Sequence, residues 1–241
     1  MTATIIKKDV FQFHTNCVSE DAGNEQKVTD CPFCGKEKHL YYNPDPTKLL
    51  WDCKVCQRKG NKYTFLSLLY EQQCHVVFEV PEKGIPYNHY ATAGVRRNPF
   101  NDTLVIPTYN NEGALNNLYK YVAHSNRWMS SPTCAHGLLG NREVLHDEVW
   151  ICEGHFDYLA AIAMIGVTRP ISPVGVPGAG VFKEEWLYKL KDKKITIIGD
   201  NDDAGLAMLE KIIELIKESP AKPKSVHSVS WEGKKTGYDL R

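Results

Sequence analysis

The sequence predicts an α/β protein in which a parallel sheet with flanking helices follows a small mixed subdomain and an N-terminal β ribbon. Three observations predict this class. From residue 148 onward, apolar strands alternate with helical patterns, as they do in the strand–helix–strand units of a parallel sheet. Between residues 31 and 56, two cysteine pairs lie among short segments of β-like pattern. Residues 80–86, with two prolines and a glycine, form the linker expected between the two parts.

The composition limits the classes of function that need consideration. In the 241 residues, lysine plus arginine equals aspartate plus glutamate at 29 each, so no overall positive charge indicates nucleic-acid binding. Basic side chains can still cluster on one part of the surface of a protein whose net charge is zero. A hydrophobic content of 42% argues against wholesale disorder. The N-terminus has no secretory signal pattern, and the longest uncharged run of the C-terminal half, residues 158–167, is too short to cross a bilayer. We therefore expect a cytoplasmic protein without a membrane partner.

Four of the eight cysteines have the spacing of metal ligands. They are Cys31, Cys34, Cys53 and Cys56. Each Cys-x-x-Cys pair is expected on a tight turn, and segments 39–43 and 47–52 are predicted to form the strands of a hairpin that carries both turns. Four thiolates on two such turns form a closed tetrahedral site, so we expect one structural Zn²⁺. The alternative is a redox-active Cys-x-x-Cys pair, and the presence of two pairs at this spacing argues against it.

Two aromatic residues of this ribbon, Tyr42 and Trp51, have two interpretations. They could stack on unpaired bases of a nucleic acid, since every base has a face on which an aromatic ring can stack. Alternatively, they could cover the hairpin as part of its core, which is the more common role for a single aromatic side chain. The sequence leaves both open.

Two acidic residues follow a predicted strand in the C-terminal half. Residues 195–198 are β-favouring and read as a buried strand, and Asp200 and Asp202 come directly after it. Residues two apart in an extended segment point to the same side, so both carboxylates can converge on one spot. Ligands of open α/β sheets bind beyond the carboxyl ends of the strands, and carboxylate oxygens there suit Mg²⁺ or Mn²⁺. The alternative is a helix N-cap, because a helical pattern begins at Asp203.

A second strand ends in an acidic residue in the same way. Residues 149–153 form a short apolar strand that ends in Glu153 and Gly154, and a helix rich in apolar residues follows. Asp157 lies four residues after Glu153, so a helical turn would place both on one face. Acidic residues at the ends of two predicted strands therefore predict one shared site.

This arrangement resembles the Toprim domain, which is shared by DnaG-type primases, topoisomerases and several nucleases. The resemblance covers roughly residues 148–231 and lies in a Glu-Gly-x-x-Asp segment followed, after roughly fifty residues, by Asp-x-Asp-x-Ala-Gly. It implies that Glu153, Asp200 and Asp202 hold catalytic Mg²⁺ or Mn²⁺ and that Asp157 supports them in catalysis.

Segments before residue 148 resemble DnaG-type primases too. The stretch CPFC…WDCKVCQRKGNKYTFLSLLYEQ looks like the zinc ribbon of bacterial and phage primases. A hairpin over 103–122, an SSP segment and an LxG segment resemble the subdomain before Toprim in the same family. On that match Lys120 and Arg127 fall at basic positions that hold template backbone or nucleotide phosphates.

The resemblance implies the following domains. Residues 1–79 form a zinc-binding domain, 80–86 a linker, and 87–241 an RNA polymerase domain that consists of a basic subdomain (87–147) and Toprim (148–241).

The function expected from the resemblance is that of a DNA primase, a DNA-templated RNA polymerase. Such an enzyme uses a single-stranded DNA template and ribonucleoside triphosphates, and works with a replicative helicase that is fused or separate. The expected location is the cytoplasm of a bacterium or of a phage-infected host, and the chain would be a fragment or a free-standing primase.

Two other functions stay open at this point. One is a Toprim-type metal-dependent nuclease, and the other is a non-catalytic DNA-binding module similar to the RecR recombination mediators, which also combine four cysteines with Toprim. The cysteines lie near the N-terminus, far before the acidic motifs, and this order of motifs along the chain favours a primase. A topoisomerase would need a nucleophilic tyrosine on a separate domain and a longer chain to form a gate.

Overall fold

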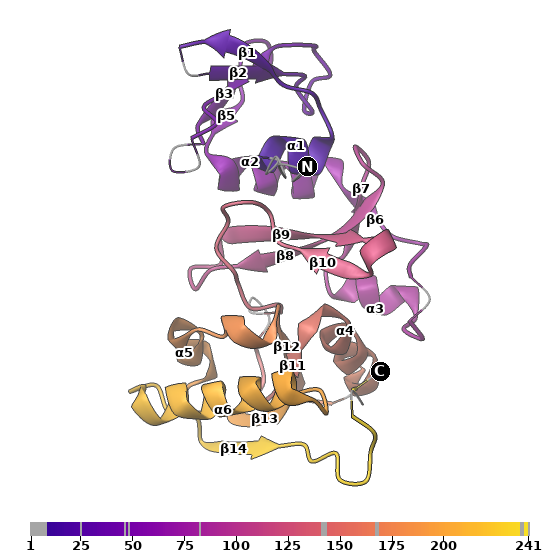
Figure 1. The fold of residues 1–241 in the computed structure, drawn as a ribbon, viewed down its shortest axis with the longest axis vertical. Coiled ribbons are helices and arrows are strands. Elements are labelled where there is room, and N and C mark those ends of the chain that lie inside the picture. The colour runs from indigo at the N-terminus through magenta and orange to yellow at the C-terminus, as the bar shows by residue number, and fades with distance from the viewer. Residues whose placement is uncertain are drawn as a thin grey trace, which may run out of the picture. The chain divides into compact units, whose positions relative to one another are not determined.

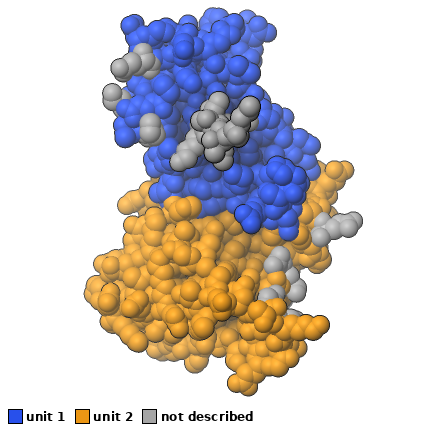
Figure 2. All heavy atoms as spheres, viewed as in Figure 1, with its two compact units in different colours: residues 1–77, 95–107, 115–135 blue, residues 78–94, 108–114, 136–241 orange. Residues whose placement is uncertain are grey.

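Three sheets organise the described part of the chain in the computed structural model (Figure 1). The structure describes residues 9–24, 26–45, 47, 49–81, 83–140, 144–166, 169–236 and 239–240. Contacts divide the chain into two compact units (Figure 2). Unit 1 comprises residues 1–77, 95–107 and 115–135, and unit 2 comprises residues 78–94, 108–114 and 136–241. Unit 1 therefore combines the N-terminal ribbon with most of the subdomain expected at 87–147, so the domain limits drawn from the sequence stay a prediction.

The first sheet belongs to unit 1 and is antiparallel, in the order β1-β2-β3-β4-β5. Its strands are β1 (Glu20–Gly23), β2 (Gln26–Thr29), β3 (Leu40–Tyr42), β4 (Trp51–Cys53) and β5 (Lys59–Gly60). Two helices accompany it, α1 (Val10–Thr15) and α2 (Lys62–Leu68), the second of which continues into a π-helical turn over Leu69–Gln73. The Asp9 side chain caps α1, and the Asn61 side chain caps α2 by accepting from two backbone N–H groups. The sequence pattern had not indicated α1 or the β1–β2 hairpin.

The second sheet, also largely in unit 1, has the order β10-β9-β8-β7-β6. Its strands are β6 (His75–Val76), β7 (Arg96–Asn98), β8 (Thr103–Tyr109), β9 (Leu115–Val122) and β10 (Arg127–Met129). The predicted hairpin is confirmed as β8 and β9, which a turn at Asn110–Gly113 connects. Helix α2 packs against β9 and buries Phe65 and Leu66, so the ribbon and this sheet share apolar surface within unit 1.

The third sheet forms the centre of unit 2 and is parallel throughout, in the order β12-β11-β13-β14. Its strands are β11 (Glu148–Glu153), β12 (Ile171–Val176), β13 (Lys194–Ile198) and β14 (Ser225–Ser228). The α-helices that the structure describes in unit 2 are α3 (Tyr87–Thr92), α4 (Gly154–Ile165), α5 (Leu187–Leu190) and α6 (Asp203–Glu218). The predicted parallel sheet with flanking helices is confirmed.

Both faces of this sheet are covered. One face packs, through residues such as Val149 and Ile195, against α5 and α6, with Met208 and Ile212 of α6 fully buried. The other face presents Cys152 and Ile198 to Ala161 and Ile165 of α4. A parallel sheet buried on two faces is typical of doubly wound α/β folds, in which ligands bind beyond the carboxyl ends of the strands. Among the described residues, the structure contains no helix long and apolar enough to cross a membrane.

Candidate metal centres

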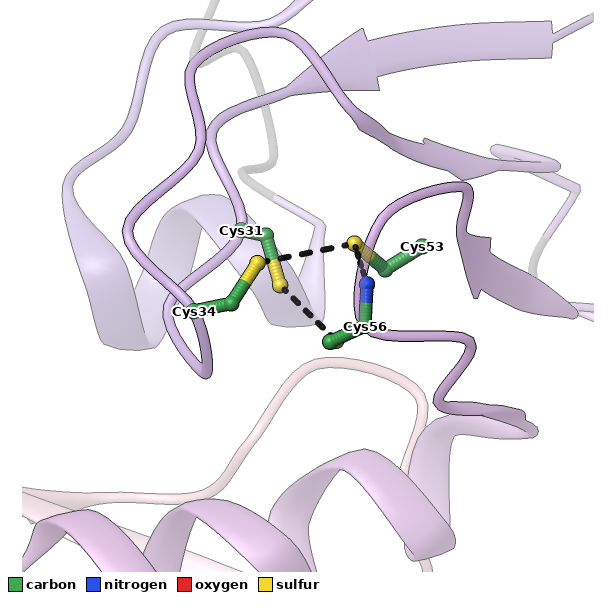
Figure 3. A group of neighbouring side chains, drawn as sticks. All are labelled: Cys31, Cys34, Cys53 and Cys56. Atoms are coloured by element: carbon green, nitrogen blue, oxygen red, sulfur yellow. Dashed lines mark hydrogen bonds between the residues drawn. The ribbon is translucent and has the colours of Figure 1, made fainter.

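The four predicted cysteine ligands come together at one point of unit 1 (Figure 3). Their sulfur atoms all lie within 4.8 Å of one another. The Sγ atoms of Cys31 and Cys56 are 3.9 Å apart, and those of Cys34 and Cys53 are 3.8 Å apart. A zinc tetrahedron with Zn–S bonds of about 2.3 Å has edges of about 3.8 Å, so this donor set fits Zn²⁺.

Local structure explains why the four thiols meet. Gly35, at a φ of +71°, completes the first turn, and its N–H donates to the Cys31 carbonyl. Strand β4 ends at Cys53 and begins the second turn. Burial raises the pKa of the Cys31 thiol, so a bound cation would supply the charge that keeps it ionised.

The aromatic residues of the ribbon form its core. Tyr42 and Trp51 are 1% and 3% exposed, and the Trp51 ring lies 5.9 Å from Phe65 of α2 and 5.5 Å from Phe33, centroid to centroid. The Trp51 indole N–H donates to the Asn61 carbonyl. The base-stacking interpretation of Tyr42 and Trp51 is therefore wrong, and the alternative that they cover the hairpin is correct.

The second candidate centre lies beyond the carboxyl ends of β11 and β13 in unit 2. Carboxylate oxygens of Asp157, Asp200 and Asp239 lie within 4.8 Å of one another and could hold a metal ion. Glu153, the last residue of β11, adjoins this group because its carboxylate accepts from the Asp200 backbone N–H at 3.2 Å. Oxygen donors of this kind suit a hard divalent cation.

Asp202 has the capping role that the sequence left open as an alternative. Its Oδ1 accepts from the Gly205 N–H at 2.9 Å and so caps α6, and the side chain is exposed. A Cβ atom on Gly205 would come within 2.1 Å of the Asp200 carbonyl oxygen, so only glycine permits this close turn from strand to helix. The turn therefore fixes the backbone of Asp200 directly beneath the start of α6.

Asp239 was not predicted from the sequence. It follows β14 by eleven residues, the described residues around it (229–236 and 239–240) form no strand or helix, and no motif or periodicity marks it. Only the tertiary structure brings it to Asp157 and Asp200.

Like charges and burial shift the acidity of this group. The pKa of Asp200 is raised from 3.8 to about 7, first by burial and then by the charges of Asp157, Glu153, Asp239 and Asp202. The pKa of Glu153 is also raised, mainly by burial. A divalent cation would relieve this repulsion, which is the electrostatic signature expected of a metal site.

Comparison with known proteins places the acidic centre in a recognised domain. Residues 150–236 match the family model described as Toprim-like. This part of the chain is a Toprim-like domain. The primase fragment of the bacteriophage T7 primase-helicase protein superposes with a TM-score of 0.50 at 15% identity, covering 87% of this chain and 92% of that one. The catalytic domain of a DnaG primase bound to single-stranded DNA superposes with a TM-score of 0.52 at 13% identity, covering 74% and 72%.

The chain thus has the DnaG-type primase fold, with the Toprim-like domain at its C-terminal end. No sequence among the curated proteins matches it. The Toprim-like domain contains four of the five acids described above, and Asp239 lies three residues beyond the matched segment.

The two basic residues predicted to hold phosphate lie in unit 1, outside the Toprim-like domain. Lys120 of β9 pairs with Met129 of β10, and Arg127 pairs with Val122, so the two basic side chains project from the same face of the sheet. Arg127 is exposed. The Lys120 ammonium donates to the Phe13 carbonyl at 2.5 Å and lies 3.9 Å from the Phe13 ring centroid.

The raised pKa of Asp200 predicts a pH dependence of stability. Without a divalent metal at the acids, the Asp200 carboxyl holds its proton more tightly in the folded protein than in the unfolded chain. The contribution of Asp200 to the free energy of unfolding is therefore present at low pH and is lost as pH rises through about 7. We therefore expect the melting temperature of wild type to fall relative to that of Asp200→Asn between about pH 5 and pH 8. Thermal unfolding of both proteins tests this, and melting temperatures that keep a constant difference would contradict it.

Proposed function

We propose that this protein is a DNA primase that makes short RNA primers on single-stranded DNA by metal-dependent nucleotidyl transfer. The observation that carries the proposal is the acidic group at the carboxyl ends of β11 and β13 within a primase fold. Its partners would be a single-stranded DNA template, ribonucleoside triphosphates and a replicative helicase. The similar T7 protein is a primase-helicase, and the similar DnaG domain is bound to single-stranded DNA.

We assign each acid a role according to its position. Asp157, Asp200 and Asp239 would hold Mg²⁺ or Mn²⁺, and Glu153 and Asp202 would add negative charge beside them. A bound divalent metal would stabilise charge on the attacking and leaving oxygens at the nucleotide α-phosphate. Because Glu153 accepts from the Asp200 N–H, it would also hold Asp200 in place.

Lys120 and Arg127 would position phosphates of the template or nucleotide. Arg127 is exposed, and its guanidinium can contact a phosphate with two N–H groups. Lys120 would have to exchange its bond to the Phe13 carbonyl for a phosphate oxygen. The zinc ribbon would provide a rigid support for contacts with the template.

A primer synthesis assay tests the proposed function. The full chain is incubated with mixed single-stranded templates, the four ribonucleotides and Mg²⁺ or Mn²⁺. Short labelled oligoribonucleotides are the expected product. A shortened template would identify a nuclease, and no product of either kind would favour a binding module.

Arg127→Ala tests the proposed phosphate contact. We expect weaker binding to single-stranded DNA of every sequence and a salt-dependence slope reduced by about one, because one cation leaves the interface. Fluorescence anisotropy at several salt concentrations measures both quantities.

Arg97→Ala is the matched control, since Arg97 lies on β7 of the same sheet and pairs with Asp102 at 2.8 Å. Equal losses in the two variants would show that Arg127 has no specific role.

A further inference from the structure

We propose that Asn201 and Trp231 are positioning residues that fasten the C-terminal segment so that Asp239 can join the metal-binding acids. This inference rests on the proposed function, because it assumes that a divalent metal binds at Asp157 and Asp200. Both residues belong to unit 2, as do the hydrogen-bond acceptors and the apolar cluster described below. Neither was singled out from the sequence.

The Asn201 side chain connects the two segments directly. Its amide nitrogen donates to the Lys235 carbonyl at 2.8 Å and lies 3.3 Å from the Lys234 carbonyl. Asn201 stands between Asp200 and Asp202, in the loop that joins β13 to α6. The contact therefore couples the position of the C-terminal segment to the backbone that carries Asp200.

Trp231 makes a second connection to the same loop. Its indole N–H donates to the Gly199 carbonyl at 2.7 Å, one residue before Asp200. Its ring packs against the apolar cluster that contains Cys152 and Ile198. Leu240 packs against that cluster as well, so apolar contacts hold both ends of the segment that contains Asp239.

Physical chemistry explains why such anchors are needed. After β14, the described residues 229–236 and 239–240 contain no strand or helix that would hold them, so fixing them costs conformational entropy. The charges of Asp157 and Asp200 also repel a third carboxylate before any cation is bound. Hydrogen bonds and apolar contacts, which are independent of the acidic charges, can offset both costs.

The same contacts explain why an amide side chain stands at position 201. In the run Asp200-Asn201-Asp202-Asp203, position 201 is the one with an amide. An amide nitrogen can donate to two carbonyl oxygens, whereas an ionised carboxylate can only accept. An aspartate at position 201 would be similar in shape but would repel the carbonyls of Lys234 and Lys235.

Binding of Mn²⁺ to the full-length, zinc-loaded protein tests the inference without reference to activity. Free Mn²⁺ is measured by electron paramagnetic resonance in titrations of wild type and of Asn201→Ala, Asn201→Asp, Trp231→Phe and Asp239→Asn. We expect each variant to weaken Mn²⁺ binding about tenfold, the lower end of the range for groups that orient metal ligands. Combining Asn201→Ala with Asp239→Asn should add little further loss, since both changes remove the same contribution.

Asn201→Asp gives the sharpest discrimination. It adds a fourth carboxylate to the loop, so tighter or unchanged Mn²⁺ binding would show that charge alone matters and would overturn the inference. Losses that multiply in the double variant would overturn it as well.

Asn111→Ala is the matched control and should bind Mn²⁺ as wild type does, because Asn111 of unit 2 also donates from its side chain to a backbone carbonyl, that of Glu185. The proposed metal site itself is tested by Asp200→Asn. Unchanged binding in that variant would refute the proposed function, whereas lost binding there with normal binding in Asn201→Ala would refute this inference alone.

Discussion

Replacing Asp200 by asparagine is expected to reduce primer synthesis at least about a hundredfold, the size of losing one strong electrostatic contact in a preorganised site. The substitution keeps the shape of the side chain and removes the charge at the centre of the acidic group. Because that charge is repelled by its neighbours, the variant should be no less stable than wild type when divalent metal is absent. Glu153→Gln is expected to cause a similar loss, since it removes a charge and weakens the acceptor for the Asp200 N–H. Both effects are measured as initial rates of primer synthesis at saturating Mg²⁺ or Mn²⁺.

Asp203→Asn is the matched control for Asp200→Asn. Asp203 lies in the same acidic run, is exposed, and begins α6 without belonging to the group within metal-binding distance. Its neutralisation should change the rate by no more than a few-fold. A rate near that of wild type in Asp200→Asn would mean that the active site lies elsewhere.

The parts of the site that could be predicted are those encoded by contiguous residues. The buried strands β11 and β13 are short apolar runs, and a parallel strand presents the residues that follow it at its carboxyl end. Glu153 and Asp200 could therefore be placed near each other from the sequence alone. The zinc ligands could be predicted equally well, because the Cys-x-x-Cys turn is a local structure whose ligand geometry is known.

The parts that could not be predicted depend on contacts between distant residues. Asp239 reaches the acids through a segment without periodic pattern, held by tertiary contacts such as that of Asn201. The bond between Lys120 and the Phe13 carbonyl likewise depends on the packing of α1, a helix of six residues that the sequence pattern did not indicate. Whether Trp51 is buried or exposed was also undecidable, since an aromatic residue on a small hairpin can be either until the helix that covers it, α2, is placed.

Loss of one zinc ligand is expected to have the largest effect on stability. The apparent free energy of structural zinc binding is about 10–16 kcal/mol, which is comparable to the whole stability of a typical domain of about 5–15 kcal/mol. Cys53→Ser removes a ligand from the end of β4 and leaves three thiols that cannot close the tetrahedron. We therefore expect the wild-type protein to retain one zinc per chain after extensive dialysis and Cys53→Ser to retain none. Elemental analysis measures both.

The structure also predicts which elements lose their order when zinc is lost. The Trp51 ring contacts Phe33 and Phe65 in the core of the first sheet, and α2, which carries Phe65, packs against β9. Hydrogen exchange in Cys53→Ser should therefore increase throughout the first sheet and extend along α2 to β9 in unit 1. Unit 2 has a separate core around its parallel sheet and should keep its protection. Cys17→Ser, which changes a cysteine outside the cluster, should leave both zinc content and exchange unchanged. A metal-free Cys53→Ser protein with wild-type protection in the first sheet would show that packing alone maintains the ribbon.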